Sequence, residues 1–209
     1  MRKAVVVAWL IGIFSVIACL FWYNEWVYAL PTPIPVNYVA VKPGALIALP
    51  AALQFPDDRL KTGSKRPLLL HFFNPDCPCS RFNIPQFKSL VKQYSDRVDF
   101  AVVLLSSKEY SPQQIRKRFG LDLPVLSDTS AAAKAAIACG VYSTPQAVLL
   151  TGDHALFYRG NYNRSRYCAD PATNYASQAL EALLHQQHGI IFDPLALRSY
   201  GCRLPNCSQ

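Results

Sequence analysis

The pattern of apolar and polar positions begins with a long apolar segment at the N-terminus. Residues 4–22 carry no charged side chain, and at about 1.5 Å per helical residue they would span the roughly 30 Å hydrocarbon layer of a bilayer. Arg2 and Lys3 precede this segment, and aromatic residues follow it. This arrangement predicts a single-pass anchor with a cytoplasmic N-terminus, so the rest of the chain lies outside the cytoplasm.

Two short segments offer alternatives to an uncleaved anchor. Residues 16–19 have the shape of a lipoprotein cleavage box that ends at Cys19, and residues 27–29 have that of a signal-peptidase site. We favour the uncleaved anchor because apolar residues continue past Cys19 and the segment is long for a signal peptide. All three alternatives export the domain, which we expect in the periplasm of a bacterium, held at the inner membrane.

From residue 67 the pattern predicts strands and helices in alternation. Short apolar runs typical of buried strands lie at residues 67–73, 98–106, 123–128, 146–150 and 155–160. Helical spacing and alanine-rich composition predict helices at residues 80–94, 111–120, 129–140 and 174–187. The order β-α-β-α-β-α-β-β-α predicts an α/β fold with a mixed sheet and helices on both faces.

The same pattern sets the expected domain boundaries. Residues 30–53 contain five prolines and little periodicity, which is typical of an extended lead-in with one short strand. The predicted organisation is listed in chain order: cytoplasmic stub 1–3, transmembrane helix 4–24, linker 25–64, globular domain 65–187 and C-terminal tail 188–209.

Three motifs within residues 65–187 resemble the thioredoxin superfamily, in particular its membrane-anchored TlpA-like and peroxiredoxin-like branch. The run CGVYSTPQAVLL resembles the loop that ends in a cis-proline, here Pro145, before an outer strand. The interval from Pro145 to Gly160 resembles the family's hairpin. Pro85 follows Cys77 by eight residues, as the family's helix-kink proline follows the nucleophilic cysteine. The resemblance implies a thioredoxin-like three-layer sandwich, with Thr144 and Pro145 presenting a backbone edge to an extended substrate.

The resemblance also fixes the register of the motif Cys77-Pro78-Cys79. Cys77 takes the nucleophile's position, Cys79 the third position and Ser80 the fourth, where the family usually has its resolving cysteine. This departure puts ordinary dithiol exchange in doubt. His71 falls where thioredoxins have a buried acidic residue that assists proton transfer. A relay by His71 and a structural role for it as a buried strand residue are both open.

The reactivity expected of Cys77 can also be argued from its position in the chain, without the family resemblance. Pro78 suits the first helical position, so Cys77 is the expected helix cap, with backbone N–H groups and the positive end of the helix dipole favouring its thiolate. The thiolate is the reactive form of cysteine. Asp76 acts in the opposite direction, because an adjacent carboxylate disfavours a second negative charge.

The partner of Cys77 is the least determined part of the site. We expect Cys79 to be the resolving cysteine, through a strained and oxidising disulfide. The alternatives are a monothiol mechanism, or resolution by Cys139 or Cys168. Cys139 is better explained as a small buried residue of the core than as a resolving cysteine. For the tail we expect a structural disulfide, formed by Cys202 and Cys207 with each other or with Cys168; sequence does not determine the connectivity.

Charge and composition exclude little but help to rank the functions. The chain has 21 Lys and Arg against 13 Asp and Glu, but the basic residues lie in short scattered groups without a nucleic-acid motif, so no nucleic-acid partner is expected. The preferred hypothesis is a membrane-anchored thiol-disulfide oxidoreductase. It exchanges disulfides with protein substrates and with a redox partner protein, and it needs no cofactor and no metal.

Three other functions compete with this hypothesis. A copper or zinc chaperone would use Cys77 and Cys79, with His154 as the evident additional ligand, although His154 is better explained as an exposed turn residue. A thiol peroxidase would use Cys77 alone, but the threonine and proline expected before a peroxidatic cysteine are absent. In a non-catalytic binding module, all the cysteines would be structural.

Overall fold

The computed structural model describes residues 2–48, 65–127, 129–164, 171–187 and 189–204. The chain forms two compact units, Met1–Pro31 and Thr32–Gln209. The first unit contains helix α1, Arg2–Ala29. Its segment Arg2–Asn24 is long and apolar enough to cross a membrane, and its side chains are exposed. Exposed apolar side chains along a whole helix are what a lipid environment requires.

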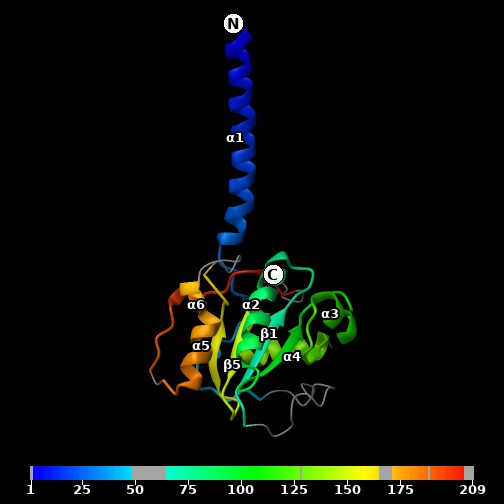
Figure 1. The fold of residues 1–209 in the computed structure, drawn as a ribbon, viewed down its shortest axis with the longest axis vertical. Coiled ribbons are helices and arrows are strands. Elements are labelled where there is room, and N and C mark those ends of the chain that lie inside the picture. The colour runs from blue at the N-terminus through cyan, green and yellow to red at the C-terminus, as the bar shows by residue number, and fades with distance from the viewer. Residues whose placement is uncertain (1, 49–64, 128, 165–170, 188, 205–209) are drawn as a thin grey trace. The chain divides into compact units, whose positions relative to one another are not determined.

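The second unit is built around a five-stranded mixed sheet (Figure 1). The strands, in their spatial order, are β3 (Val125–Leu126), β2 (Asp99–Leu104), β1 (Leu68–Phe73), β5 (Gln146–Leu150) and β6 (Leu156–Gly160). Strands β1, β2 and β3 are parallel to one another, whereas β5 is antiparallel to both β1 and β6. Each predicted strand from residue 67 onward therefore exists, and the last two form the predicted hairpin.

Helices cover both faces of this sheet (Figure 1). The helices are α2 (Pro78–Tyr94), α3 (Pro112–Phe119), α4 (Thr129–Cys139), α5 (Tyr175–Leu184), α6 (Pro194–Leu197) and the short 3-10 helix η2 (Pro171–Thr173). Side chains of α2, α3 and α5 pack in one apolar cluster and those of α4 in another. Alternate residues of β1 join the two clusters, because successive strand side chains point to opposite faces. The fold is the thioredoxin-like three-layer sandwich that the sequence predicts.

Local sequence explains where the helices begin and end. Ser111 caps α3 through a reciprocal capping box with Gln114, and Gly120 ends that helix in the left-handed conformation at φ 59°. Both ends of this helix are as predicted. In α2, Cys77 is the N-cap and Pro78 the first helical residue, again as predicted. This places the cysteine motif where β1 passes into α2.

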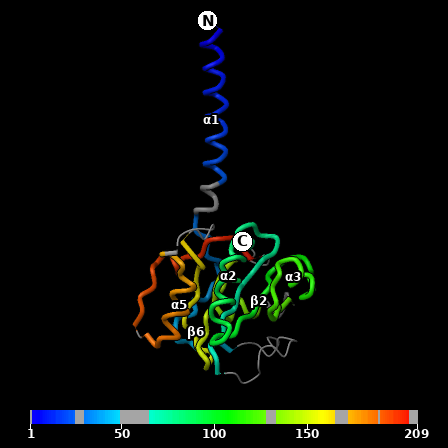
Figure 2. The backbone as a smooth tube through the Cα atoms, in the orientation of Figure 1, coloured from blue at the N-terminus to red at the C-terminus, as the bar shows by residue number. Residues whose placement is uncertain are grey.

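Two segments outside the predicted domain pack onto it. In the lead-in, Leu46 forms an antiparallel bridge with Ala155, and Ile47 is buried in the cluster that contains α4. After α5 the chain forms α6 and then β7 (Cys202–Arg203), neither of which the sequence analysis predicted. Figure 2 traces this C-terminal segment, drawn in red, back to the start of α2.

Candidate functional site

The candidate site lies at the N-terminal end of α2. Cys77 is only 3% exposed, and its extended backbone (φ −83°, ψ 121°) turns β1 into the helix. Its N–H donates to the Asn74 carbonyl at 3.2 Å, and its carbonyl accepts the first helical hydrogen bond from Arg81 at 3.3 Å. The Cys77 side chain makes no capping hydrogen bond, because its sulfur is bonded elsewhere.

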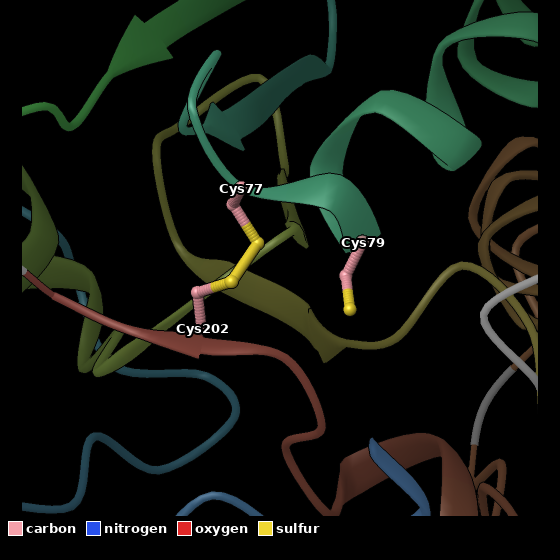
Figure 3. A group of neighbouring side chains, drawn as sticks. All are labelled: Cys77, Cys79 and Cys202. Atoms are coloured by element: carbon pink, nitrogen blue, oxygen red, sulfur yellow. A yellow bond between two sulfur atoms is a disulfide. The ribbon is translucent and has the colours of Figure 1, made fainter. Parts of the chain in front are cut away.

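Cys77 forms a disulfide with Cys202, 125 residues further along the chain (Figure 3). The two Cα atoms are 6.2 Å apart, within the usual range for a disulfide. Cys79 lies two residues further along, in the first turn of the helix, is buried and takes no part in the disulfide. The three Sγ atoms all lie within 4.8 Å of one another. The site is therefore a cluster of three sulfurs and not a pair.

This arrangement corrects two pairings expected from the sequence. Cys79, the expected resolving partner of Cys77, is not bonded to it in the structure. Cys202, expected to pair with another cysteine of the C-terminal region, is bonded to Cys77 instead. The other candidates for a tail disulfide, Cys168 and Cys207, lie outside the described residues. Cys139 is buried and free, in the apolar cluster beside α4, as expected for a small core residue.

The predicted cis-proline loop lies against this disulfide. The Thr144–Pro145 peptide bond is cis, and Sγ of Cys77 is 3.9 Å from the Thr144 carbonyl oxygen. Strand β4 (Ser143–Thr144) pairs antiparallel with β7, so that Thr144 lies opposite Cys202 and Ser143 opposite Arg203. The backbone edge that the resemblance assigns to a substrate is therefore occupied by the protein's own tail.

Several polar contacts hold the tail in this position. The N–H of Thr32 donates to the Ser199 carbonyl at 2.9 Å, and the Thr32 hydroxyl donates to the Gly201 carbonyl at 3.1 Å. The Gln146 amide also donates to the buried Ser199 hydroxyl. Gly201 has φ 143°, and a Cβ there would lie 2.1 Å from the Thr144 carbonyl oxygen. Only glycine fits this close approach.

His71 lies at the centre of β1 and is fully buried. Its Nδ1 is 2.7 Å from the Tyr162 hydroxyl, and its ring stacks on Phe87 with centroids 4.3 Å apart. Among the described residues, Nε2 has no hydrogen-bond partner. Burial lowers the pKa of His71 to about 3, because it removes water from the charged form. At neutral pH the imidazole is therefore neutral, a poor proton acceptor, and packed as a core residue.

Asp76 precedes Cys77 but is occupied by other groups. The Tyr110 hydroxyl donates to its carboxylate at 2.8 Å, the Ser106 hydroxyl donates at 3.2 Å, and Lys108 Nζ lies 3.7 Å away. Desolvation raises the pKa of Asp76, but these hydrogen bonds and cations outweigh it and hold the pKa below its usual value. Because Lys108 balances the carboxylate, Asp76 opposes a thiolate at Cys77 less than the sequence suggests.

His154, the sequence candidate for an additional metal ligand, lies elsewhere. It occupies the turn between β5 and β6 with φ 63°, and its backbone bonds to Thr151 and Ile47. Within the described part of the chain, the group of side chains close enough to share an ion consists of Cys77, Cys79 and Cys202. Two of these are buried and the third is partly buried.

Comparison with known proteins places the chain in a family. The model of a family described as a domain of unknown function, DUF6436, matches residues 49–206. The chain belongs to this family. The match includes the cysteine motif, the cis-proline loop and Cys202, so the DUF6436 domain takes in the whole candidate site. A search of curated proteins gave no match.

Two solved structures support the fold of this DUF6436 protein. A hypothetical protein from Sinorhizobium meliloti is 20% identical, with 80% of this chain and 96% of that chain covered and a TM-score of 0.60. An uncharacterised conserved protein from Geobacillus kaustophilus is 22% identical, with coverage of 84% and 97% and a TM-score of 0.61. A putative thiol:disulfide interchange protein DsbE from Chlorobium tepidum is 17% identical, with coverage of 58% and 82% and a TM-score of 0.47.

Proposed function

We propose that this DUF6436 protein is a membrane-anchored thiol-disulfide oxidoreductase whose redox-active disulfide joins Cys77 to Cys202. The observation that carries the proposal is the position of this disulfide, at the N-terminus of a 17-residue helix and against the cis-proline loop. A helix N-terminus stabilises a thiolate through its free N–H groups and its dipole. Cys77 is therefore the sulfur best placed to leave or attack as a thiolate.

The exchange proceeds in two balanced steps. A substrate thiolate attacks Sγ of Cys77, the bond to Cys202 breaks, and Cys202 leaves as a thiolate that takes a proton from solvent. A second substrate thiolate then attacks the substrate sulfur of the mixed disulfide and releases the Cys77 thiolate. Two electrons pass from the substrate dithiol to the protein disulfide. The reverse steps reduce a substrate disulfide, and the potential of the partner protein sets the direction.

The tail determines how a substrate gains access. Cys77 is buried, and β7 occupies the Thr144 edge. Breaking the Cys77–Cys202 bond removes the covalent link that holds the tail there, and hydrogen bonds and the packing of Leu204 then hold it until a substrate displaces it. An extended substrate segment takes the place of β7 along β4, where it finds the same backbone groups. The substrates of this mechanism are protein thiols and disulfides in flexible, strand-like segments.

The proposed location follows from the anchor and from the disulfide. Arg2 and Lys3 keep the N-terminus of α1 in the cytoplasm, and the thioredoxin-like domain lies in the periplasm at the inner membrane. Disulfides persist in that compartment and are rare in the cytosol. These features are compatible with the membrane-anchored TlpA-like branch that the sequence resembles.

The proposal revises the role of Cys79 and chooses between the two roles that the sequence left open for His71. The proposal gives the resolving role to Cys202, while Cys79 stays outside the disulfide in the oxidised state. His71 positions Tyr162 and fills the core under α2, since a group with its pKa lowered to about 3 does not accept a proton at neutral pH. The relay predicted for His71 remains an untested hypothesis.

The test is an exchange assay on the full-length protein in detergent. A reduced peptide with two cysteines is mixed with the oxidised protein, and the oxidised peptide is quantified. The Cys77→Ser variant should abolish exchange and Cys202→Ser should prevent catalytic turnover, whereas Cys139→Ala, which removes a buried thiol away from the site, should keep it. Full turnover by Cys202→Ser would overturn the proposed pair.

A further inference from the structure

The three sulfurs at the start of α2 form a group that disulfide exchange does not explain. Exchange through Cys77 and Cys202 needs two cysteines, yet Cys79 places a third sulfur within 4.8 Å of both (Figure 3). Cys79 is only 4% exposed, so its thiol faces the other two sulfurs and not solvent. A third buried sulfur beside a disulfide at a helix N-terminus calls for a separate account.

Reduction of the disulfide leaves the three sulfurs assembled. The tail is held independently of the bond to Cys77 by its pairing with β4 and by hydrogen bonds from Thr32 and Gln146. Cys77 and Cys79 are fixed by the first turn of α2. The reduced site therefore presents three thiols that converge from two segments of the chain.

We propose that the reduced site binds one Cu(I) ion through Sγ of Cys77, Cys79 and Cys202. Thiolate sulfur is a soft ligand that selects monovalent copper. Structural zinc requires four protein ligands, and no His, Asp or Glu of the described residues joins the three sulfurs. Three thiolates around one Cu(I) carry a net charge of −2, which the positive end of the α2 dipole helps to offset.

Copper binding involves no change in the oxidation state of the metal, and its electrons and protons are accounted for as follows. A dithiol reductant first supplies two electrons and two protons, which convert the Cys77–Cys202 disulfide into two thiols. Cu(I) then displaces the three thiol protons to solvent and forms three Cu–S bonds. The oxidised protein offers a single cysteine outside the disulfide at this site and does not bind. Metal binding and disulfide formation therefore exclude one another, and metal affinity rises with pH.

The test is a Cu(I) titration of the full-length protein in detergent, without oxygen, against a chromogenic Cu(I) chelator. The reduced wild-type protein should bind one equivalent, and the air-oxidised protein none. Cys79→Ser should lower the affinity by more than about tenfold, since loss of even an outer partner of a metal ligand costs about 10- to 100-fold. Cys139→Ala, the buried-cysteine control, should bind as the wild type does.

Two further measurements separate a loss of copper binding from a folding defect and from a failure of the exchange proposal. Cys79→Ser leaves the Cys77–Cys202 disulfide available, so mapping that bond in the variant shows whether the site is still assembled. X-ray absorption at the copper edge should show three sulfur neighbours in the wild-type protein. Wild-type affinity in Cys79→Ser, two sulfur neighbours, or tighter retention of Zn(II) than of Cu(I) would each overturn this proposal and leave the exchange mechanism standing.

Discussion

Cys79 and Cys139 are both buried, both lie outside the disulfide, and both lie at the end of a helix. Cys79 is in the first turn of α2, within 4.8 Å of two other sulfurs. Cys139 is the last residue of α4, inside an apolar cluster. Burial raises the pKa of Cys139 to about 12. Burial in an apolar cluster thus makes a cysteine unreactive. A helix N-terminus favours the reactive thiolate instead, and neighbouring sulfurs provide partners for disulfide exchange or metal binding.

The largest expected effect concerns the reactivity of Cys139. A pKa of about 12, against 9.0 for a solvent-exposed thiol, leaves about one thousandth as much thiolate at pH 8. We expect Cys139 in the folded protein to be alkylated about a thousandfold more slowly than in the urea-unfolded chain. The rate should rise about tenfold per pH unit. Mass spectrometry of the labelled peptide measures both, and rapid labelling of folded Cys139 would break the comparison with Cys79.

The next effect tests whether the tail must lie against the cis-proline loop. In Gly201→Ala the new Cβ would collide with the Thr144 carbonyl oxygen, so β7 cannot pair with β4. We expect most of the Cys77–Cys202 disulfide to be lost, as quantified by non-reducing peptide mapping. Gly189→Ala is the matched control, because Gly189 also has a positive φ, 71°, but nothing within 4 Å of the added Cβ. Equal disulfide content in both variants would contradict the account.

A third prediction asks whether His71 belongs to the core. The unfolded chain protonates His71 below about pH 6.5, whereas the folded chain does so only near pH 3. Stability therefore falls as the pH drops through this window. At pH 5 this one group should cost about 2 kcal/mol relative to pH 8. Urea unfolding at both pH values should show that loss in the wild type and a smaller one in His71→Gln; identical pH slopes would show that His71 is not buried as a neutral group.

The smallest effect comes from the contact between the lead-in and the tail. Thr32→Val keeps the shape but loses the hydroxyl that donates to the Gly201 carbonyl. One neutral hydrogen bond is worth about 1 kcal/mol, or about fivefold in an equilibrium constant. We expect the equilibrium constant of the Cys77–Cys202 disulfide with glutathione to shift about fivefold toward the reduced form. No shift would show that the Thr32 hydroxyl does not help to hold the tail.

The sequence was sufficient for the fold because the relevant signals are local. The buried runs of β1 and β2, the capping residues of α3 and the Thr144-Pro145 dipeptide each depend on neighbouring residues. Cys77 could be placed at the helix start for the same reason, from Pro78 and from the interval to Pro85.

The partner of Cys77 could not be predicted because it is 125 residues away. Five other cysteines of the exported part compete for it in sequence, and no local pattern marks β7, which is only two residues long. A weak signal existed in Gly201, which directly precedes Cys202 and is the kind of residue that a close backbone approach requires. The burial of His71 beside Tyr162 likewise depends on a contact across 91 residues.

The central claim, that Cys77 pairs with Cys202, is tested most directly by disulfide mapping of the full-length protein. Trypsin cleaves on either side of residues 199–203, which separates Cys202 from Cys168 and Cys207, while Cys77 and Cys79 stay together on the peptide 66–81. After thiols are blocked, the account predicts a cross-linked pair of peptides 66–81 and 199–203, retained in Cys79→Ser and lost in Cys77→Ser. A bond within peptide 66–81, or one between Cys202 and either of the other two cysteines, would contradict it.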